Sequence, residues 1–200
     1  FNKLSYNNIS VRMWDVRNCF KGVDLYSVGH YSRQMYFRWL IPEIFPQYRK
    51  VLYLDCDIVV AYDVAKLYEI NIRDNIVGAV NNFLRSNMES YVKESLGLSA
   101  AKYFNSGILL INTDEFLNNK VKNKCLSILR NRDKMACPYQ DAINLACEGK
   151  IYRLEDSWNF QWHHQFHDFC KGELIEDYPE RYQLLLDDQI KIYHFTSQVK

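Results

Sequence analysis

The sequence predicts an α/β fold, in which a central sheet carries helices on both of its faces. Short apolar runs rich in β-branched and aromatic residues alternate along the chain with longer segments of helical spacing, an order typical of such sheets. The 200 residues are enough for one domain with a sizeable core. No repeat, low-complexity run or linker divides the sequence, so we expect residues 1–200 to form a single domain.

The most informative strand leads directly into two aspartates. The apolar run from Val51 to Leu54 precedes Asp55, Cys56 and Asp57, and it predicts a strand buried on both faces. On an extended backbone, residues two apart leave the same face, so we expect both carboxylates on one side. A buried charge must be paired or must bind a metal, and two oxygen ligands suit Mg²⁺ or Mn²⁺. An aspartate that only caps the following turn is the alternative.

The remaining elements follow from local patterns, taken in chain order. Apolar runs and polar–apolar alternation predict strands at residues 11–16, 75–80, 108–111, 151–154 and 189–195. Helical spacing and capping signals predict helices at residues 32–41, 64–68, 88–96, 113–130 and 138–147. Pro42 marks the end of the first helix, Gly97 the end of the third, and Pro138 the first turn of the last. The alternating pattern of residues 189–195 indicates a strand near the edge of the sheet.

Composition excludes several classes of function. With 25 basic and 24 acidic residues the net charge is +1, so the chain lacks the basic excess of a nucleic-acid-binding protein. The six cysteines show no C-x-x-C spacing, which favours reduced thiols and a cytoplasmic protein. No apolar run approaches the roughly 20 residues that a membrane-spanning helix needs.

Polar residues gather where several predicted strands begin or end. The clusters are Asp55/Asp57, Asn81/Asn82, Asn105/Ser106, Gln140/Asp141 and His194. One polar cluster for each strand end is expected of a site built along one edge of a sheet. Asn and Ser near strand ends also commonly form turns, and this interpretation stays open for each cluster alone.

Four segments together make the chain resemble glycosyltransferase family 8, retaining enzymes with a nucleotide-sugar fold of the GT-A type. In family order they are Lys50–Asp57, Tyr103–Asn112, Gln140–Asn144 and His194–Lys200. The resemblance is strongest to bacterial galactosyl- and glucosyltransferases that build lipopolysaccharide. It implies a mixed, mostly parallel central sheet, and we expect residues 1–200 to lack the family's first strand, its uridine-binding loop and its C-terminal tail.

The resemblance also implies an activity. It predicts transfer of a hexose, galactose or glucose, from a UDP-sugar to a glycan or lipid-linked saccharide acceptor, with Mn²⁺ or Mg²⁺ as cofactor. Since similar enzymes act at the cytoplasmic face of the membrane, we also expect a cytoplasmic protein that associates peripherally with that face.

Individual roles follow from the resemblance residue by residue. Asp55 and Asp57 match the metal-binding Asp-x-Asp, and His194 matches the third ligand. Gln140 matches the glutamine near the anomeric carbon and forms the predicted catalytic pair with Asp141, which could instead orient the Gln140 loop or cap a helix. The predicted donor-binding residues are His30, Arg38, Asp55, Asn82, Asn105, Gln140 and Lys200.

The expected chemistry is stabilisation of a departing diphosphate. A divalent ion, Lys200 and Arg38 would offset the negative charge that develops on UDP. Retention in hydrolases usually needs a carboxylate nucleophile, whereas the amide of Gln140 is a poor one. We therefore favour a front-face mechanism, in which the acceptor hydroxyl attacks on the side from which UDP leaves.

Three positions depart from the family pattern. Tyr139 stands where an acid usually precedes Gln140, so the identity of the donor sugar is open. Asn82 stands where many relatives have an aspartate, and its amide can hydrogen-bond a hydroxyl but cannot accept a proton. Ser197 stands where a glycine is expected.

Two other functions compete with the transferase. A non-catalytic module that binds nucleotide sugars or glycans would tolerate Tyr139 and the missing first strand. A haloacid-dehalogenase-like phosphatase also has Asp-x-Asp after a buried strand, but it needs Thr or Ser where Val59 stands, and it gives His194 and Lys200 no role.

The histidine-rich segment near residue 165 raises a third possibility. His163 and His167 have zincin spacing, but His164 occupies the position of the glutamate base, which argues against a zinc hydrolase. Trp158 and Asn159, just before this segment, are candidates for lining the acceptor cleft.

Overall fold

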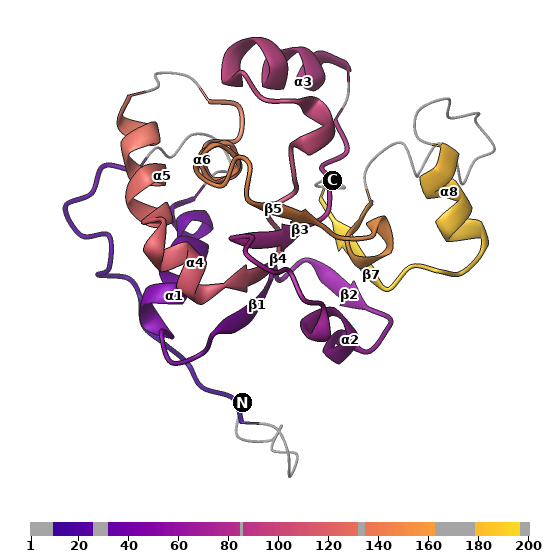
Figure 1. The fold of residues 1–200 in the computed structure, drawn as a ribbon, viewed down its shortest axis with the longest axis horizontal. Helices are drawn as coiled ribbons and strands as arrows, with labels where there is room; N and C mark the ends of the chain where they lie inside the picture. The colour runs from indigo at the N-terminus through magenta and orange to yellow at the C-terminus, as the bar shows by residue number, and fades with distance from the viewer. Residues whose placement is uncertain (1–9, 26–31, 85, 132–134, 163–178, 197–200) are drawn as a thin grey trace.

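A computed structural model describes residues 10–25, 32–84, 86–131, 135–162 and 179–196 (Figure 1). Its strands form two sheets instead of one. The larger sheet, of order β1-β4-β3-β5, contains Lys50–Leu54 (β1), Val77–Ala79 (β3), Ile108–Asn112 (β4) and Ile151–Arg153 (β5). The smaller sheet, of order β2-β7-β6, contains Ile58–Val60 (β2), Phe160–Trp162 (β6) and Ile192–Phe195 (β7).

The larger sheet is mixed, as predicted, but the described strands are not mostly parallel. Strand β4 runs antiparallel to both β1 and β3, and of the five pairings in the two sheets only β3–β5 and β6–β7 are parallel. The chain leaves β3 and re-enters at the same end, where Asn82 N donates to Tyr103 O (2.8 Å) and Asn105 N to Val80 O (2.9 Å). A connection that returns to the end it left must reverse the next strand.

The helices are short and mostly follow their predicted starts. The α-helices are Ile41–Ile44 (α1), Val64–Glu69 (α2), Ser86–Tyr91 (α3), Thr113–Asn118 (α4), Val121–Arg130 (α5), Pro138–Ala146 (α6) and Pro179–Leu186 (α8). The remaining helical segments are the 3₁₀ helices Arg33–Leu40 (η1), Ala100–Lys102 (η3) and Asp156–Trp158 (η4), and the π-helical segment Val92–Leu96 (η2).

Alternation along β1 explains the layers of the fold. Val51 and Tyr53 pack on the larger core cluster, which includes buried residues of η1, α4, α5 and α6. Leu52 and Leu54 point the other way and pack with Leu67 of α2 in a second cluster, which also includes residues of the smaller sheet. The prediction of helices on both faces is therefore confirmed, and α4, α5 and α6 lie together on one side in Figure 1.

Several predicted elements differ from the structure. Residues 11–16 form no strand, because no neighbouring strand is available to them among the described residues. The helix predicted at residues 113–130 is two helices, since Lys120 has a left-handed backbone (φ 52°) that an α-helix cannot continue. Pro42 lies in the first turn of α1 and does not end the preceding helix, because a first-turn residue needs no N–H partner.

Strand β7 was predicted near an edge, and this is wrong. It lies in the middle of the smaller sheet, antiparallel to β2 and parallel to β6. Alternation reports which face of a strand is exposed, and it carries no information on the number of neighbouring strands. Both neighbours are only three residues long, too short to be recognised from local pattern alone.

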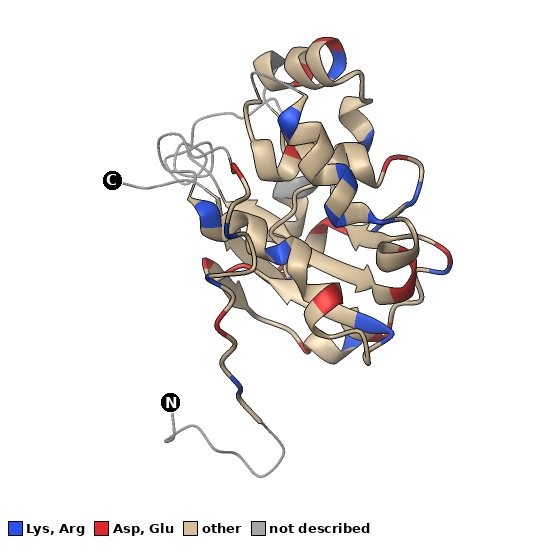
Figure 2. Ribbon diagram, turned by 90° about the vertical axis from the view of Figure 1, so that its left-hand side faces the viewer, with Lys and Arg blue, Asp and Glu red and all other residues tan. Residues whose placement is uncertain are grey.

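Charged residues are interspersed over the described elements, with Lys and Arg close to Asp and Glu (Figure 2), in agreement with the near-zero net charge. Within the described residues, no helix combines the length and hydrophobicity that a membrane crossing requires. Cys19, Cys56, Cys125 and Cys147 carry free thiols.

Candidate functional site

The Asp-x-Asp segment forms a bend that joins the two sheets. β1 ends at Leu54 and β2 begins at Ile58, so the backbone between them is not extended as predicted. Asp55 N donates to Gly107 O at the start of β4 (2.8 Å), and Asp57 O accepts from Phe195 N of β7 (2.9 Å). The two carboxylates therefore converge because the bend is anchored to both sheets, and not because of strand alternation.

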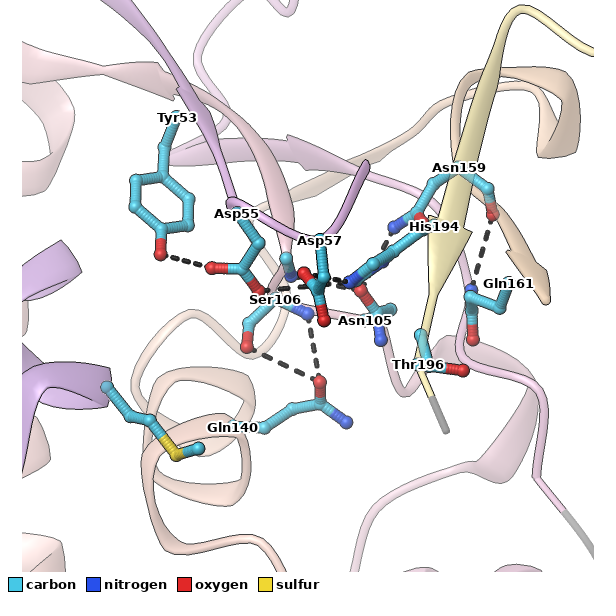
Figure 3. Close-up of polar contacts among 12 residues, drawn as sticks. Tyr53, Asp55, Asp57, Asn105, Ser106, Gln140, Asn159, Gln161, His194 and Thr196 are labelled. Carbon is cyan, nitrogen blue, oxygen red and sulfur yellow. Dashed lines mark hydrogen bonds and ion pairs between the residues drawn. The ribbon is translucent and has the colours of Figure 1, made fainter. Parts of the chain in front are cut away.

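The three predicted metal ligands meet at this junction (Figure 3). The Nε2 atom of His194 lies 3.9 Å from Asp55 Oδ2 and 3.4 Å from Asp57 Oδ1. One ligand atom from each of the three residues lies within 4.8 Å of the others. The His194 side chain is 4% exposed, whereas the Asp57 side chain is 51% exposed and faces solvent.

This geometry fits a divalent cation. Ligand atoms about 2.1 Å from an octahedral ion lie at most about 4.2 Å apart, so the two distances to His194 are compatible with a shared ion. The half-exposed side chain of Asp57 can turn to bring its oxygen closer to that of Asp55. Two carboxylates and one imidazole suit Mn²⁺ or Mg²⁺ by ligand type.

Gly107 makes the convergence possible. A Cβ atom on Gly107 would overlap Cε1 of His194 and would lie 2.8 Å from Asp55 Oδ2. Any side chain here would therefore push two of the three candidate ligands apart. The sequence identifies Asn105 and Ser106 as a polar cluster at a strand end. The requirement for glycine at position 107 becomes visible only in the folded structure.

Asp55 is held from behind by two residues. It accepts hydrogen bonds from the Tyr53 hydroxyl and from Arg38 Nη2 (3.1 Å). Burial, as the largest cause, raises the pKa of Tyr53. The hydroxyl therefore stays protonated and donates a hydrogen bond to Asp55. Both donors contact Oδ1, and Arg38 Nη2 also lies 3.5 Å from Oδ2, the oxygen that faces His194 Nε2.

Arg38 is not open to solvent as a diphosphate ligand would be. Its guanidinium donates to the Ser106 carbonyl and hydroxyl as well as to Asp55, and Arg38 is only 5% exposed. Its Cζ lies 4.8 Å from the ring centroids of both Tyr53 and Tyr139, within range of cation–π attraction. Tyr139, at the position of a family acid, thus stabilises the same cation with a neutral ring.

Asp57 is bound more loosely. Contact with the His194 ring, whose Nε2 lies 3.4 Å away, is the largest cause that holds the pKa of Asp57 below its ordinary value of 3.8, and burial opposes this shift. The carboxylate form, which a metal requires, is therefore favoured by the same residue that completes the ligand set.

The two residues of the predicted catalytic pair, Gln140 and Asp141, have different surroundings. Gln140 Oε1 accepts from Ser106 N (2.9 Å), and its Nε2 donates to the Tyr103 hydroxyl (3.3 Å). Asp141 has no exposed surface and accepts from Tyr103, from the Tyr91 hydroxyl (2.8 Å) and from Cys137 N (3.0 Å). This arrangement supports one of the roles considered for Asp141, which is to orient the start of α6. It gives the buried carboxylate no contact with a sugar.

Asn82 and Asn105 lie in one amide network. Asn105 Nδ2 donates to Asn82 Oδ1 (3.0 Å), and Asn105 Oδ1 accepts from Gly107 N (2.9 Å). The network continues through Asn159, whose Nδ2 donates to Asn105 Oδ1 (3.0 Å) and whose Oδ1 contacts His194 Nδ1 (2.9 Å).

Asn159 is the contributor that sequence reasoning misassigned. It has no exposed surface and Trp158 is 3% exposed, so neither residue lines an open acceptor cleft. No local signal identifies its role, since its partner His194 is 35 residues away in the sequence.

His30, Lys200, Ser197, His163 and His167 lie outside the described residues. Their predicted roles, or the absence of one, remain predictions.

Comparison with known proteins identifies relatives. The family model described as glycosyl transferase family 8 matches residues 2–200. The general stress protein A of Bacillus subtilis is 28% identical over 138 residues, covering 66% of this chain and 47% of that protein. The lipopolysaccharide 1,2-glucosyltransferase of Escherichia coli is 25% identical over 172 residues, covering 85% and 49%. The chain thus spans about half the length of these relatives.

Solved structures agree on the fold. A crystal structure of the galactosyltransferase LgtC, in complex with donor and acceptor sugar analogues, superposes with a TM-score of 0.70 at 24% identity, covering 92% of this chain and 65% of that one. At this identity the likeness establishes the GT-A fold alone, and it confirms the predicted fold class.

Proposed function

The chain belongs to glycosyltransferase family 8, and from that premise we propose that it transfers glucose or galactose from a UDP-sugar to a glycan or lipid-linked saccharide, with retention of configuration. The observation that carries this proposal is the convergence of Asp55, Asp57 and His194 within 4.8 Å, at the junction of the two sheets. A carboxylate–carboxylate–imidazole set of this kind suits an ion that holds a diphosphate.

Mn²⁺ or Mg²⁺ is the proposed cofactor, with Asp55, Asp57 and His194 as its protein ligands. When bound, such an ion acts as a Lewis acid and a template for the departing diphosphate. The protein's own contribution is orientation. Arg38 neutralises one of the two carboxylate charges from behind, and with the Tyr53 hydroxyl it aims Asp55 Oδ2 into the site.

The proposed mechanism is front-face substitution. Gln140 is 5% exposed, and its amide oxygen already accepts from Ser106 N, so it makes an unsuitable nucleophile and a well-positioned dipole. The acceptor hydroxyl would then attack on the face from which the diphosphate leaves. A covalent glycosyl-enzyme formed from donor alone would contradict this mechanism.

Of the alternatives, the binding module is the one that an observation favours. Tyr139 packs its ring against Arg38 and supplies no carboxylate beside Gln140. A binding module is therefore distinguished from a transferase by weak or absent turnover of the donor. The phosphatase has no such support, since the family match covers residues 2–200. A cytoplasmic location with peripheral association at the inner face of the membrane completes the proposal.

The decisive experiment is UDP release from a panel of UDP-sugars, with Mn²⁺ and then with EDTA. We expect slow release with UDP-glucose or UDP-galactose, lost with EDTA and lost in Asp57→Ala. The matched control is Asp74→Ala, an exposed carboxylate just before β3, at the opposite end of the larger sheet from Asp55. The control should keep full release.

Each contrary result has a distinct meaning. Binding of Mn²⁺ and UDP without release from any UDP-sugar would replace the transferase with the binding module. Release that persists in EDTA and in Asp57→Ala would contradict the metal site. Equal losses in Asp57→Ala and Asp74→Ala would show that the effect is not specific to the site.

A further inference from the structure

We propose that Asn159 is a positioning residue that fixes the tautomer of His194, through a chain of amide hydrogen bonds that begins at the backbone N–H of Gly107. The inference deepens the proposed function, and it rests on that function only for the role of His194 Nε2 as the ligand atom. The tautomer itself can be tested without donor or acceptor.

The chain of contacts crosses from the larger sheet to the smaller one (Figure 3). Gly107 N lies 2.9 Å from Asn105 Oδ1, which lies 3.0 Å from Asn159 Nδ2. Asn159 Oδ1 then lies 2.9 Å from His194 Nδ1. Asn105, Asn159 and His194 are all buried, so water does not replace these partners.

The direction of every bond follows from its first member. A backbone N–H can only donate, so the Asn105 atom that faces Gly107 is the amide oxygen. An oxygen of this kind cannot donate, so the Asn159 atom that faces it is the nitrogen. The other end of the Asn159 amide is then an oxygen, and the ring nitrogen that it meets must carry a hydrogen. In the neutral ring the hydrogen therefore sits on Nδ1.

This assignment leaves the lone pair of His194 on Nε2. That atom faces Asp55 Oδ2 (3.9 Å) and Asp57 Oδ1 (3.4 Å). A histidine that binds a metal through one ring nitrogen commonly donates from the other to a fixed acceptor, which sets both its tautomer and its orientation. Asn159 is that acceptor here.

The two carboxylates compete with the amide chain for the hydrogen. A hydrogen on Nε2 would face Asp57, but it would also point the Nδ1 lone pair at the Asn159 oxygen across 2.9 Å. The Asp57 side chain is half exposed, can turn away, and is further from the ring at 3.4 Å. Asn159 is fully buried and tied to the backbone through Asn105, so it cannot turn. The amide chain therefore decides the tautomer.

The same chain explains why position 82 carries an acceptor oxygen. Asn105 Oδ1 is committed to Gly107 and Asn159, so its nitrogen must find an acceptor, which is Asn82 Oδ1 at 3.0 Å. Position 82 thus needs an acceptor oxygen, which asparagine and aspartate both supply.

The test measures the ring directly. ¹⁵N chemical shifts of the His194 nitrogens would be recorded in the metal-free protein at a pH where the ring is neutral, and again with Mg²⁺. The signals would be assigned by their loss in His194→Gln. We expect a protonated Nδ1 and an unprotonated Nε2 in wild type, in both samples.

Three variants sharpen the test. In Asn159→Leu we expect the hydrogen to move to Nε2 in the neutral ring, and the Mn²⁺ dissociation constant, measured by electron paramagnetic resonance, to rise about 10- to 100-fold. Asn105→Asp keeps the acceptor for Gly107 and Asn159, so it should keep the wild-type tautomer. The matched control Gln161→Met removes a buried amide from the paired strand. This amide contacts Phe83 N and the backbone oxygens of Asn81 and Asn159, but neither the Asn159 side chain nor the ring, so the variant should leave both readouts unchanged.

Two results would overturn the inference. One is a wild-type neutral ring with its hydrogen on Nε2. This measurement needs no variant, so it tests the inference even if Asn159→Leu fails to fold. The other is a folded Asn159→Leu with unchanged ¹⁵N shifts and unchanged Mn²⁺ affinity. By contrast, an Nδ1–H ring in a protein that binds no Mn²⁺ would support the inference about Asn159 and contradict the proposed function.

Discussion

The inner strands of the larger sheet and the edge strand β2 of the smaller sheet differ in burial. In the larger sheet, β3 is wholly buried and so are four of the five residues of β4, with helices packed against them. In the smaller sheet, edge strand β2 exposes Val59 (53%) and Val60 (43%). The candidate site lies where these unequal halves meet, with Asp55 tied to the larger sheet and His194 carried by the smaller one.

The two carboxylates reflect this difference. Asp55 is bound by Tyr53 and by the buried cation Arg38, whereas Asp57 has His194 as its main partner and faces solvent. A site with one fixed and one adaptable carboxylate can keep its shape when empty and still adjust to an incoming ion. The comparison teaches that equal ligands in a motif need not contribute equally to stability.

The largest expected effect is the difference in stability between a variant that lacks the Asp55 carboxylate and one that lacks the Asp57 carboxylate. Asp55→Ala leaves Arg38 buried without a carboxylate, which should lower the free energy of unfolding by about 3 kcal/mol. Asp57→Ala should change it by no more than about 0.5 kcal/mol, because its side chain is half exposed. Chemical denaturation measures both, and equal stability losses would remove the distinction drawn here.

A second prediction concerns the close approach at Gly107. Gly107→Ala should weaken Mn²⁺ binding by about 100-fold or more, because the new methyl group would displace both His194 and Asp55. Gly78→Ala is the matched control, since its Cβ would meet Ile72 Cγ2 at 2.9 Å inside the larger sheet, away from the site. Both variants should lose about 1–3 kcal/mol of stability from overpacking, and only the first should lose the metal. Isothermal titration with Mn²⁺ would separate them.

The smallest effect compares matched valines in the two sheets. Val77→Thr places a hydroxyl in a fully buried position of β3 and should cost about 1–3 kcal/mol. Val59→Thr makes the same change on exposed β2 and should stay within about 0.5 kcal/mol. If thermal unfolding gave equal shifts for both, β2 would be as tightly packed as β3.

Much of the site was predictable because its signals are local. The apolar run before Asp55 identifies β1, and the spacing of Asp55 and Asp57 identifies a pair of oxygen ligands. Pro138 and Gly97 marked helix boundaries that the structure has, since their backbone preferences act within a few residues.

Other features depend on contacts between distant segments. The bend between β1 and β2, the central place of β7 and the reversal of β4 are set by which strands find each other, and a local pattern carries no such information. The close approach that requires Gly107 and the burial of Arg38 behind Asp55 likewise arise only when the segments are packed.

The sequence by itself determined the family, the α/β class and three candidate ligands, because residue type and spacing encode ligand chemistry and local backbone preference. The tertiary structure alone decided how those ligands are held. Asn159 reaches His194 across 35 residues, and Arg38 reaches Asp55 across 17. Hydrogen-bond direction in a buried network depends on the identity of every neighbour in space, and only the folded chain brings those neighbours together.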